Sequence, residues 1–182
     1  MARLLVLTRD GATALAFLVL VALIAAKLGD RPDIRHQGAF RAADGDSLVL
    51  DGQRLRLKGI DAPELSQTCE RQGQEWGCGR QARRALQELV SQPGTQCGGN
   101  ERDRYDRLLV TCHNDAGNIN ARMVASGMAV SYGGYAREEE QARAGRLGLW
   151  AGRFDMPRDV RDEARHGKSG LQRLIGGWTG WQ

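Results

Sequence analysis

One long apolar run stands out in the hydrophobic pattern, close to the first residue. Residues Ala12–Ala26 (ATALAFLVLVALIAA) carry no charge, and Arg3 and Arg9 precede them. Such a run behind basic residues is typical of an export signal or a membrane anchor, with a buried core helix as the weaker interpretation. The cleavage site that would follow Ala26 is mediocre, so an uncleaved anchor is slightly favoured. Both the signal and the anchor interpretation predict that the arginines stay inside and that the rest of the chain is exported.

Short alternating segments replace this run from Gly38 onward. In residues 53–60 (QRLRLKGI) leucines alternate with basic residues, which is the period of a strand with one buried face. The pair Asp51-Gly52 predicts a hairpin before this strand, and Gly59 predicts a bulge or sharp bend near its end. About five strands are expected, drawn from residues 38–43, 47–51, 53–60, 95–99, 107–114 and 128–132.

Helical spacing of apolar residues appears in three later segments. Residues 80–91 repeat apolar side chains at helical spacing and end before a Pro-Gly pair. A second helix, capped by Asn118, is expected to run through residue 127, and a charged third helix to cover residues 136–147. The Gly- and Gln-rich segment 66–77 is expected to be a loop.

The elements together predict an α+β fold, an OB-type five-stranded β-barrel with about three flanking helices, preceded by a signal or anchor helix. The expected organisation is a leader and linker over 1–35, the barrel domain over 36–155 and a C-terminal tail over 156–182. The apolar residues of 167–182, including two tryptophans, fall on one helical face. They fit a membrane-interface helix or a poorly ordered end, and the second interpretation is preferred.

Composition is compatible with this organisation. The chain has 182 residues, 41% of them hydrophobic and 26% charged, so it is long enough for one domain with a core and is not a disordered polyampholyte. The net charge of +4 mildly favours an anionic partner, such as nucleic acid or a membrane surface. No obligate protein partner is predicted.

Four cysteines lie in the part expected to be exported, namely Cys69, Cys78, Cys97 and Cys112. An even number in an oxidising compartment indicates disulfides, and four cysteines allow three pairings. The favoured pairing is Cys69–Cys78, closing a loop, and Cys97–Cys112, joining neighbouring strands. A zinc site is the weaker alternative, because no C-x-x-C pair exists and only His113 is nearby.

Carboxylates cluster at the ends of the first strands. Asp44 and Asp46 flank the turn before residues 47–51, and Asp61 and Glu64 follow the third strand. Adjacent strands can bring the two segments together, and converging acidic oxygens suit Ca²⁺ or Mg²⁺. Each residue also has a plain interpretation: Asp-Gly-Asp as a tight turn, Asp61 as a cap and Glu64 as a solvated loop charge.

Two arginines strengthen the chemical interpretation. Arg56 lies on the polar face of the strand that leads to Asp61, and Arg107 lies where a charged segment becomes apolar. A cation that neutralises phosphate, a carboxylate that orients or deprotonates water and arginines that hold phosphate together make a phosphodiester site.

The segments DGDSLVL, RLRLKGIDAPE and DRYDRLL, in this order, resemble the staphylococcal (thermonuclease-type) nuclease family, in an exported, disulfide-bearing branch. The resemblance runs from about Gly38 to Trp150 and includes the later GMAVSY and GLW. It implies a five-stranded OB-type barrel with three helices and Ca²⁺-dependent hydrolysis of DNA and RNA that leaves 3′-phosphate ends.

The resemblance also implies a role for each matching position. Ca²⁺ would be bound by Asp46, Asp61 and the carbonyl of Ala62, and Asp44 would hold metal-bound water. The scissile phosphate would be held by Arg56 and Arg107, and Glu64 would act on the attacking water as base or positioner. The nucleotide would be flanked by Tyr105 and Tyr132. Three departures stand out. Ala62 replaces a frequent hydroxyl residue, Ser47 replaces a commoner Thr, and Asp106 replaces a usual Gly beside Arg107. The loop 65–79 also lacks a lysine run.

Three hypotheses follow for the function. The leading one is a calcium-dependent nuclease of the cell envelope, anchored by its N-terminal segment, or periplasmic or secreted if the leader is cleaved. The second is a catalytically weak or inactive OB-fold module that binds nucleic acid or protein. The third is a membrane-tethered interaction protein that acts through its C-terminal tryptophans.

Overall fold

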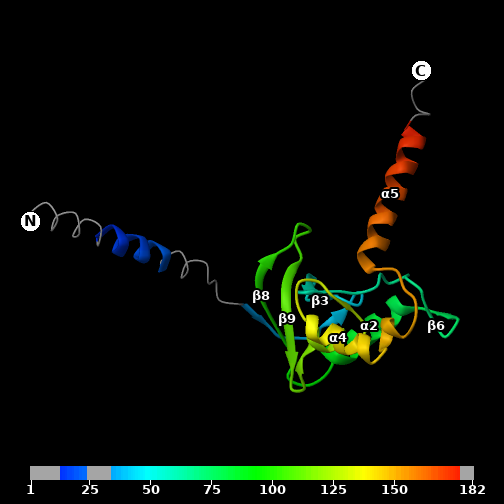
Figure 1. Ribbon diagram of the computed structural model, residues 1–182, viewed down its shortest axis with the longest axis horizontal. Coiled ribbons are helices and arrows are strands. Elements are labelled where there is room, and N and C mark those ends of the chain that lie inside the picture. The colour runs from blue at the N-terminus through cyan, green and yellow to red at the C-terminus, as the bar shows by residue number, and fades with distance from the viewer. Residues whose placement is uncertain (1–12, 24–33, 177–182) are drawn as a thin grey trace, which may run out of the picture. The chain divides into compact units, whose positions relative to one another are not determined.

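A computed structural model of the chain describes residues 13–23 and 34–176, with side chains as far as residue 166 (Figure 1). The chain divides into two units, residues 1–33 and 34–182. In the first unit, residues 13–23 are helical and their large apolar side chains are exposed. The remainder of the predicted signal or anchor lies outside the described residues. Among the residues that the structure describes, no helix combines the length and apolar character that membrane crossing requires.

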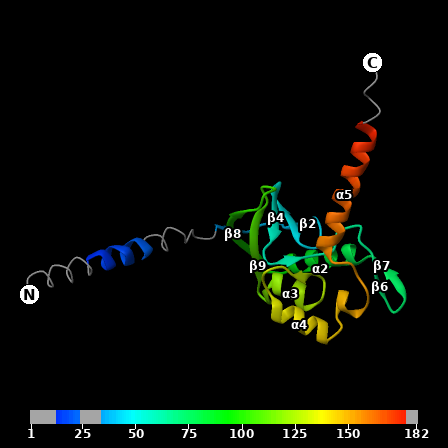
Figure 2. The same ribbon diagram turned by 45° about the horizontal axis from the view of Figure 1, so that its top comes forward.

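The second unit is built on a mixed β-sheet. Its strands are β1 (Ile34–His36), β2 (Arg41–Ala42), β3 (Ser47–Leu50), β4 (Gln53–Leu57), β8 (Gln96–Arg102), β9 (Leu108–Asn114) and β10 (Gly117–Asn118). They are ordered β1-β8-β9-β4-β3-β2, and β10 pairs with β9. The pair β4–β9 is parallel, so a crossover must join these strands, and helix α2 (Cys78–Val90) lies within it (Figure 2). This arrangement fits the predicted α+β, OB-like fold.

Two further strand pairs stand apart from this sheet. β5 (Ile60–Asp61) pairs with β11 (Val130–Ser131), and β6 (Cys69–Arg71) forms a hairpin with β7 (Gln74–Trp76). Two sequence predictions are therefore wrong in detail. The main sheet has seven strands, not five, because the short strands β1 and β10 add to it. The segment 66–77 is not a plain loop, because its Gln72-Gly73 turn has positive φ at both residues, as a tight hairpin requires.

The predicted helices are present with shifted ends, and one more follows them. They are α2, α3 (Ile119–Ala125), α4 (Ala136–Ala144), the 3₁₀ turn η1 (Gly148–Ala151) and α5 (Pro157–Gly176). Asn118 caps α3 as predicted, because its side chain accepts a hydrogen bond from the amide of Ala121 at 3.0 Å. α5 extends to residue 176, so the first part of the predicted tail is helical; residues 177–182 lie outside the described part of the chain, and the preference for a poorly ordered end stays a prediction.

A buried asparagine fixes the parallel strands to α3. The side chain of Asn120 is fully buried; it accepts a hydrogen bond from the amide of Cys112 at 3.0 Å and donates to the carbonyls of Lys58 and Val110 at 3.0 and 3.2 Å. A buried amide is tolerated only when it is hydrogen bonded in this way. Asn120 therefore positions the end of β4, just before the turn that leads into β5 and Asp61.

The cysteines form two disulfides, Cys69–Cys78 and Cys97–Cys112, which is the pairing that the sequence favoured over zinc. Cys97 and Cys112 face each other across β8 and β9. Cys69 and Cys78 join the β6–β7 hairpin to α2 and pack in a small apolar cluster with Trp76 and Trp150. The hairpin is thereby fixed to the domain through a covalent bond.

Candidate nuclease site

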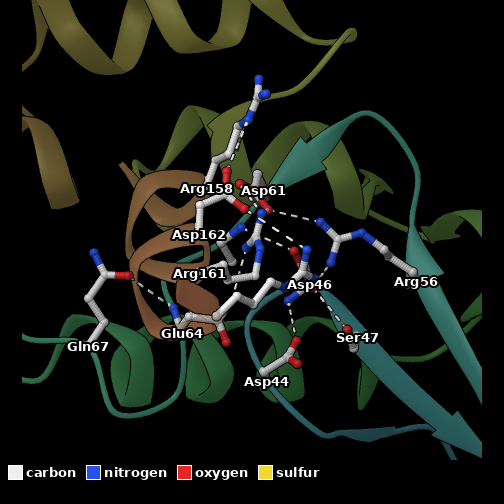
Figure 3. A network of polar contacts seen from close by, with 12 residues as sticks. Asp44, Asp46, Ser47, Arg56, Asp61, Glu64, Gln67, Arg158, Arg161 and Asp162 are labelled. Carbon is white, nitrogen blue, oxygen red and sulfur yellow. Dashed lines mark hydrogen bonds and ion pairs between the residues drawn. The ribbon is translucent and has the colours of Figure 1, made fainter. Parts of the chain in front are cut away.

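The two acidic segments of the sequence meet in the structure. Asp44 accepts a hydrogen bond from the amide of Asp46 at 3.0 Å, and Asp46 in turn accepts one from the amide of Ala62 at 3.2 Å (Figure 3). The residue between the aspartates is Gly45, where an added Cβ would lie 2.6 Å from the Cβ of Ala62 and 2.7 Å from that of Ala82. The close approach of this turn to the Asp61–Ala62 segment and to α2 therefore requires glycine.

Arg56 bridges two buried carboxylates. Its Nη1 donates to Asp46 at 2.8 Å and its Nη2 donates to Asp61 at 2.9 Å. Asp46 and Asp61 are 3% and 2% exposed, and Ser47 also donates to Asp46 at 2.9 Å. Arg56 reaches both because it lies on the polar face of β4, opposite Ser47 in the β3–β4 pair. The strand alternation read from the sequence thus sets this contact.

Burial and charge shift the ionisation of this group. Burial raises the pKa of Asp46 to about 7; Arg56 opposes the rise, and the charges of Asp44 and Asp61 add to it. Burial by itself lowers the pKa of Arg56, but the charges of Asp46 and Asp61 outweigh burial and raise that pKa above its ordinary value. Asp46 is therefore a carboxylate whose charge requires a cationic partner.

Glu64 lies at the edge of this cluster. Its side chain is 39% exposed. Its backbone is fixed by Gln67, whose Oε1 accepts a hydrogen bond from the Glu64 amide at 3.1 Å and whose Nε2 donates to the carbonyl of Asp155 at 2.7 Å. A carboxylate that is near buried aspartates yet open to solvent can reach a water molecule, as the predicted role requires.

Arg107 lies in the same groove but is held by a residue that the sequence analysis did not single out. Asp103 accepts from the amide of Arg107 at 3.0 Å and from its Nε at 2.8 Å. Burial raises the pKa of Asp103, but the hydrogen bonds from Arg107 and from the Tyr105 amide outweigh burial and lower that pKa. Asp103, four residues before Arg107 in the same loop, therefore fixes the Arg107 side chain.

Asp106 is the residue beside Arg107 that replaces a usual Gly, and its side chain pairs with Arg102. It has φ of 61°, the left-handed region that favours glycine, and its side chain is 85% exposed and paired with Arg102 at 3.3 Å. The two predicted nucleotide-flanking residues, Tyr105 and Tyr132, are 50% and 59% exposed. Both line the groove that also contains the aspartates.

The groove has a volume of about 1040 Å³ and is mainly basic. It includes Asp44, Asp46, Ala62, Glu64, Arg56, Arg107, Tyr105 and Tyr132, so it gathers nearly all predicted site residues. Asp61 does not line the groove itself but is hydrogen bonded to Arg56, which does. Eight of the residues that line the groove are basic and five are acidic. A surface of this kind suits a polyanion.

A family model described as staphylococcal nuclease homologue matches residues 54–152, which is more than half of the chain. The chain belongs to the staphylococcal nuclease family. The match covers β4 from its second residue, together with Asp61, Glu64 and Arg107, but it begins after the Asp44–Asp46 turn and ends before α5. This membership agrees with the resemblance carried by the DGDSLVL, RLRLKGIDAPE and DRYDRLL segments.

Individual relatives agree with this assignment. The succinoglycan biosynthesis protein ExoI of Rhizobium meliloti (strain 1021) is 33% identical over 121 residues, covering 62% of this chain and 63% of that protein. An uncharacterised endonuclease of Haemophilus influenzae is 33% identical over 122 residues, covering 61% and 64%. The micrococcal nuclease of Shigella flexneri is 34% identical over 132 residues, covering 61% and 71%. The chain thus spans just under two thirds of the length of the first two relatives.

Staphylococcal nuclease family members depend on a metal, and the residues present fit a hard cation. Asp46 and Asp61 supply two buried carboxylates, the ligand type that Ca²⁺ and Mg²⁺ prefer. Within the described part of the chain, no cluster of three His, Cys, Asp or Glu side chains is arranged to hold a metal. A cation here would need backbone carbonyl and water oxygens as well, which is usual for hard cations.

The structure adds one site residue from outside the matched family region. Arg161 of α5 donates from Nη2 to both carboxylate oxygens of Asp61, each at 2.8 Å, and from Nη1 to Glu64 at 3.0 Å (Figure 3). Burial alone would lower the pKa of Arg161, but the hydrogen bonds and charges of Asp61 and Glu64 raise it above its ordinary value. No sequence pattern predicts this contact, because the partners are about 100 residues apart and Arg161 lies in a charged segment without a motif.

Proposed function

We propose that this chain is a nuclease that hydrolyses phosphodiester bonds of DNA, RNA or both, with Ca²⁺ as its cofactor. The observation that carries the proposal is the arrangement of Asp46 and Asp61, buried and bridged by Arg56, beside the solvent-accessible Glu64 in a basic groove. Membership of the staphylococcal nuclease family and the description of two relatives as nucleases support the same activity.

Each side chain has a defined task in this proposal. Glu64 accepts a proton from the attacking water or positions that water against phosphorus. Arg56 and Arg107 donate hydrogen bonds to the non-bridging oxygens and stabilise the charge that develops in the transition state. Tyr105 and Tyr132, exposed at the groove, flank the nucleotide.

Asp46 and Asp61, with the carbonyl of Ala62, hold the cation, and Asp44 orients the water around it. A bound Ca²⁺ supplies charge neutralisation and polarisation of the phosphate. The 5′ P–O bond breaks, which leaves a 3′-phosphate and a 5′-hydroxyl.

We also propose that the domain acts outside the cytoplasm, in the cell envelope or beyond. The support is the apolar run Ala12–Ala26 behind basic residues and the pair of disulfides, which persist in oxidising compartments. Fusion of a reporter that is active only in the cytoplasm to the C-terminus tests this topology; strong reporter activity would refute it.

The activity is tested with the oxidised full chain and a fluorescent single-stranded DNA, first with Ca²⁺ and then with EGTA. Chelation is expected to abolish cleavage, and added Ca²⁺ to restore it. Glu64→Gln should lower kcat by ~10²–10⁴-fold, because a positioned base contributes about that much, and Arg107→Ala by ~10²–10³-fold.

Glu88→Gln is the matched control, because Glu88 lies on the exposed face of α2. Near-wild-type turnover in Glu64→Gln would refute the role of Glu64. Tight, salt-sensitive DNA binding without cleavage in any condition would favour the OB-fold binding module instead.

A further inference from the structure

Helix α5 lies beyond the part of the chain that matches the nuclease family, and it places an arginine at the site. Arg161 contacts both oxygens of Asp61 and one oxygen of Glu64. The side chain of Asp61 is 2% exposed and that of Arg161 is 27% exposed, so the contact is largely shielded from solvent. Such bidentate, charge-assisted hydrogen bonds are among the stronger polar contacts in proteins.

A cation cannot bind Asp61 while Arg161 occupies both oxygens of that carboxylate. Ca²⁺ binds carboxylate oxygens at about 2.3–2.6 Å. Arg161 already lies 2.8 Å from each oxygen of Asp61, and Arg56 donates to one of them as well. Adding the cation would bring two positive charges into contact. Arg161 must therefore leave Asp61 when the cation binds.

The start of α5 is fixed at the groove, so a released Arg161 stays near it. Gln67 joins the amide of Glu64 to the carbonyl of Asp155, two residues before the helix begins. Arg165 donates to the hydroxyl of Tyr105 at 2.6 Å and lies 5.6 Å from the centre of its ring. These contacts keep the first turns of α5 beside the residues proposed to bind nucleotide.

One face of α5 has the chemistry of a phosphate-binding surface. Arg158, Arg161 and Arg165 are spaced three and four residues apart, so they share a helix face, and all three line the groove. Asp162 lies among them, 3.8 Å from Arg158 and 4.0 Å from Arg165. Three arginines outnumber one carboxylate on this face, which gives it a net positive charge at the place where a polynucleotide would enter.

We propose that α5 is a substrate-binding arm of the site, in which Arg161 holds Asp61 and Glu64 in the substrate-free protein and transfers to a phosphate of a single-stranded nucleic acid when the divalent cation binds. This inference rests on the proposed function. It assigns Arg161 two partners in turn, the carboxylates and a phosphate, and it predicts opposite effects of its removal on cation binding and on nucleic acid binding.

The first measurement is cation binding without nucleic acid. The midpoint of thermal unfolding is followed against Ca²⁺ concentration for the wild type, Arg161→Gln and Arg161→Ala. Both variants remove the competing charge, and Gln keeps a polar, helix-compatible side chain should Ala disturb the fold. The Ca²⁺ concentration for half-maximal stabilisation is expected to fall about tenfold, as the loss of a charge-assisted contact implies. Arg153→Gln, which removes an exposed arginine paired with Glu70, should leave it unchanged.

The second measurement is nucleic acid binding at saturating Ca²⁺, as the KM of a fluorescent single-stranded DNA oligonucleotide. Arg161→Gln is expected to raise KM about fivefold to tenfold, because one phosphate contact is lost. Arg153→Gln again serves as control. Should the wild type prove inactive, fluorescence anisotropy of the same oligonucleotide measures its Kd in place of KM, so a failure of the proposed function is recognised separately.

The outcomes are distinct. Tighter Ca²⁺ binding together with weaker nucleic acid binding in Arg161→Gln supports the exchange. Tighter Ca²⁺ binding with unchanged or tighter nucleic acid binding overturns it, because Arg161 then only blocks the site. Unchanged or weaker Ca²⁺ binding also overturns it, because Arg161 and the cation then do not compete for the carboxylates. The absence of any stabilisation by Ca²⁺ overturns it as well.

Discussion

Gly45 lies between the two aspartates of the first acidic turn, and its replacement by alanine tests how that turn is positioned. An added Cβ would lie 2.6 Å from the Cβ of Ala62 and 2.7 Å from the Cβ of Ala82. The optimal distance between non-bonded carbons is about 3.5–4.0 Å, so both contacts would be roughly 1 Å too short. The φ of Gly45 is not in the left-handed region, so the predicted effect comes from the clash and not from the backbone conformation.

The expected loss follows from overpacking. Inserting a methyl group into a well-packed core costs about 1–3 kcal/mol, so Gly45→Ala should lower the free energy of unfolding by about 2 kcal/mol. For a domain of this size that corresponds to a fall in Tm of roughly 4–8 °C. Relief of the clash must also move Asp46 away from Ala62. A misplacement of about 1 Å can cost on the order of 10²-fold in rate, so kcat should fall by a similar factor.

Urea unfolding and DNA cleavage are measured on the same preparation of the oxidised chain. Gly145→Ala is the control, because Gly145 follows α4 with helical φ and an added Cβ would come no closer than 3.2 Å to Leu147 and 3.3 Å to the carbonyl oxygen of Gln141. It should be neutral or slightly stabilising. An unfolding free energy within 0.5 kcal/mol of wild type, a bound set at roughly the size of ordinary surface substitutions, would refute the clash for Gly45→Ala.

Three further results are expected. Asp106→Gly should change kcat/KM less than about twofold, because the Asp106 side chain is 85% exposed and pairs with Arg102; a tenfold gain in cleavage would contradict this. Asn120→Ala should lower the free energy of unfolding in urea by about 3 kcal/mol, since the buried Cys112 amide and Lys58 carbonyl lose their partner; a loss below about 1 kcal/mol would argue against that role. In EDTA, the Tm of the wild type should fall as pH rises from about 4 to 7, relative to the Tm of Asp46→Asn. The folded protein keeps a proton on Asp46 up to a pKa of about 7, whereas the unfolded chain releases it near 3.8, so folding is disfavoured as pH rises. Parallel Tm profiles of the two proteins would exclude this.

Local chemistry made several features predictable. The Asp51-Gly52 pair and the alternation of residues 53–57 predicted the β3–β4 hairpin, because turn type and strand period are properties of neighbouring residues. Arg56 lies on the polar face for the same reason, which is why it reaches the carboxylates of Asp46 and Asp61. The Asn118 cap and the spacing of α2 were predicted on similar grounds.

Other features were outside the reach of sequence pattern. The parallel pairing of β4 with β9 joins segments that are more than fifty residues apart, and no local period encodes such a partner. The hairpin β6–β7 was missed because its residues are mostly polar and show no apolar alternation. It is stabilised instead by its disulfide to α2 and by its own Trp76, which packs in the same apolar cluster as Trp150. Asp103 was passed over because its only signal was proximity to Arg107.

Residue type and short spacing are enough to predict which groups can take part in phosphodiester chemistry and on which strand faces or turns they lie. Tertiary structure decided how those groups are paired. The contact of Arg161 with Asp61 spans 100 residues, and Gln67 and the Arg165–Tyr105 hydrogen bond hold the start of α5 beside the site. Contacts of that kind depend on how the whole chain packs. In the sequence alone, Arg161 is therefore indistinguishable from any other charged residue on a solvated helix.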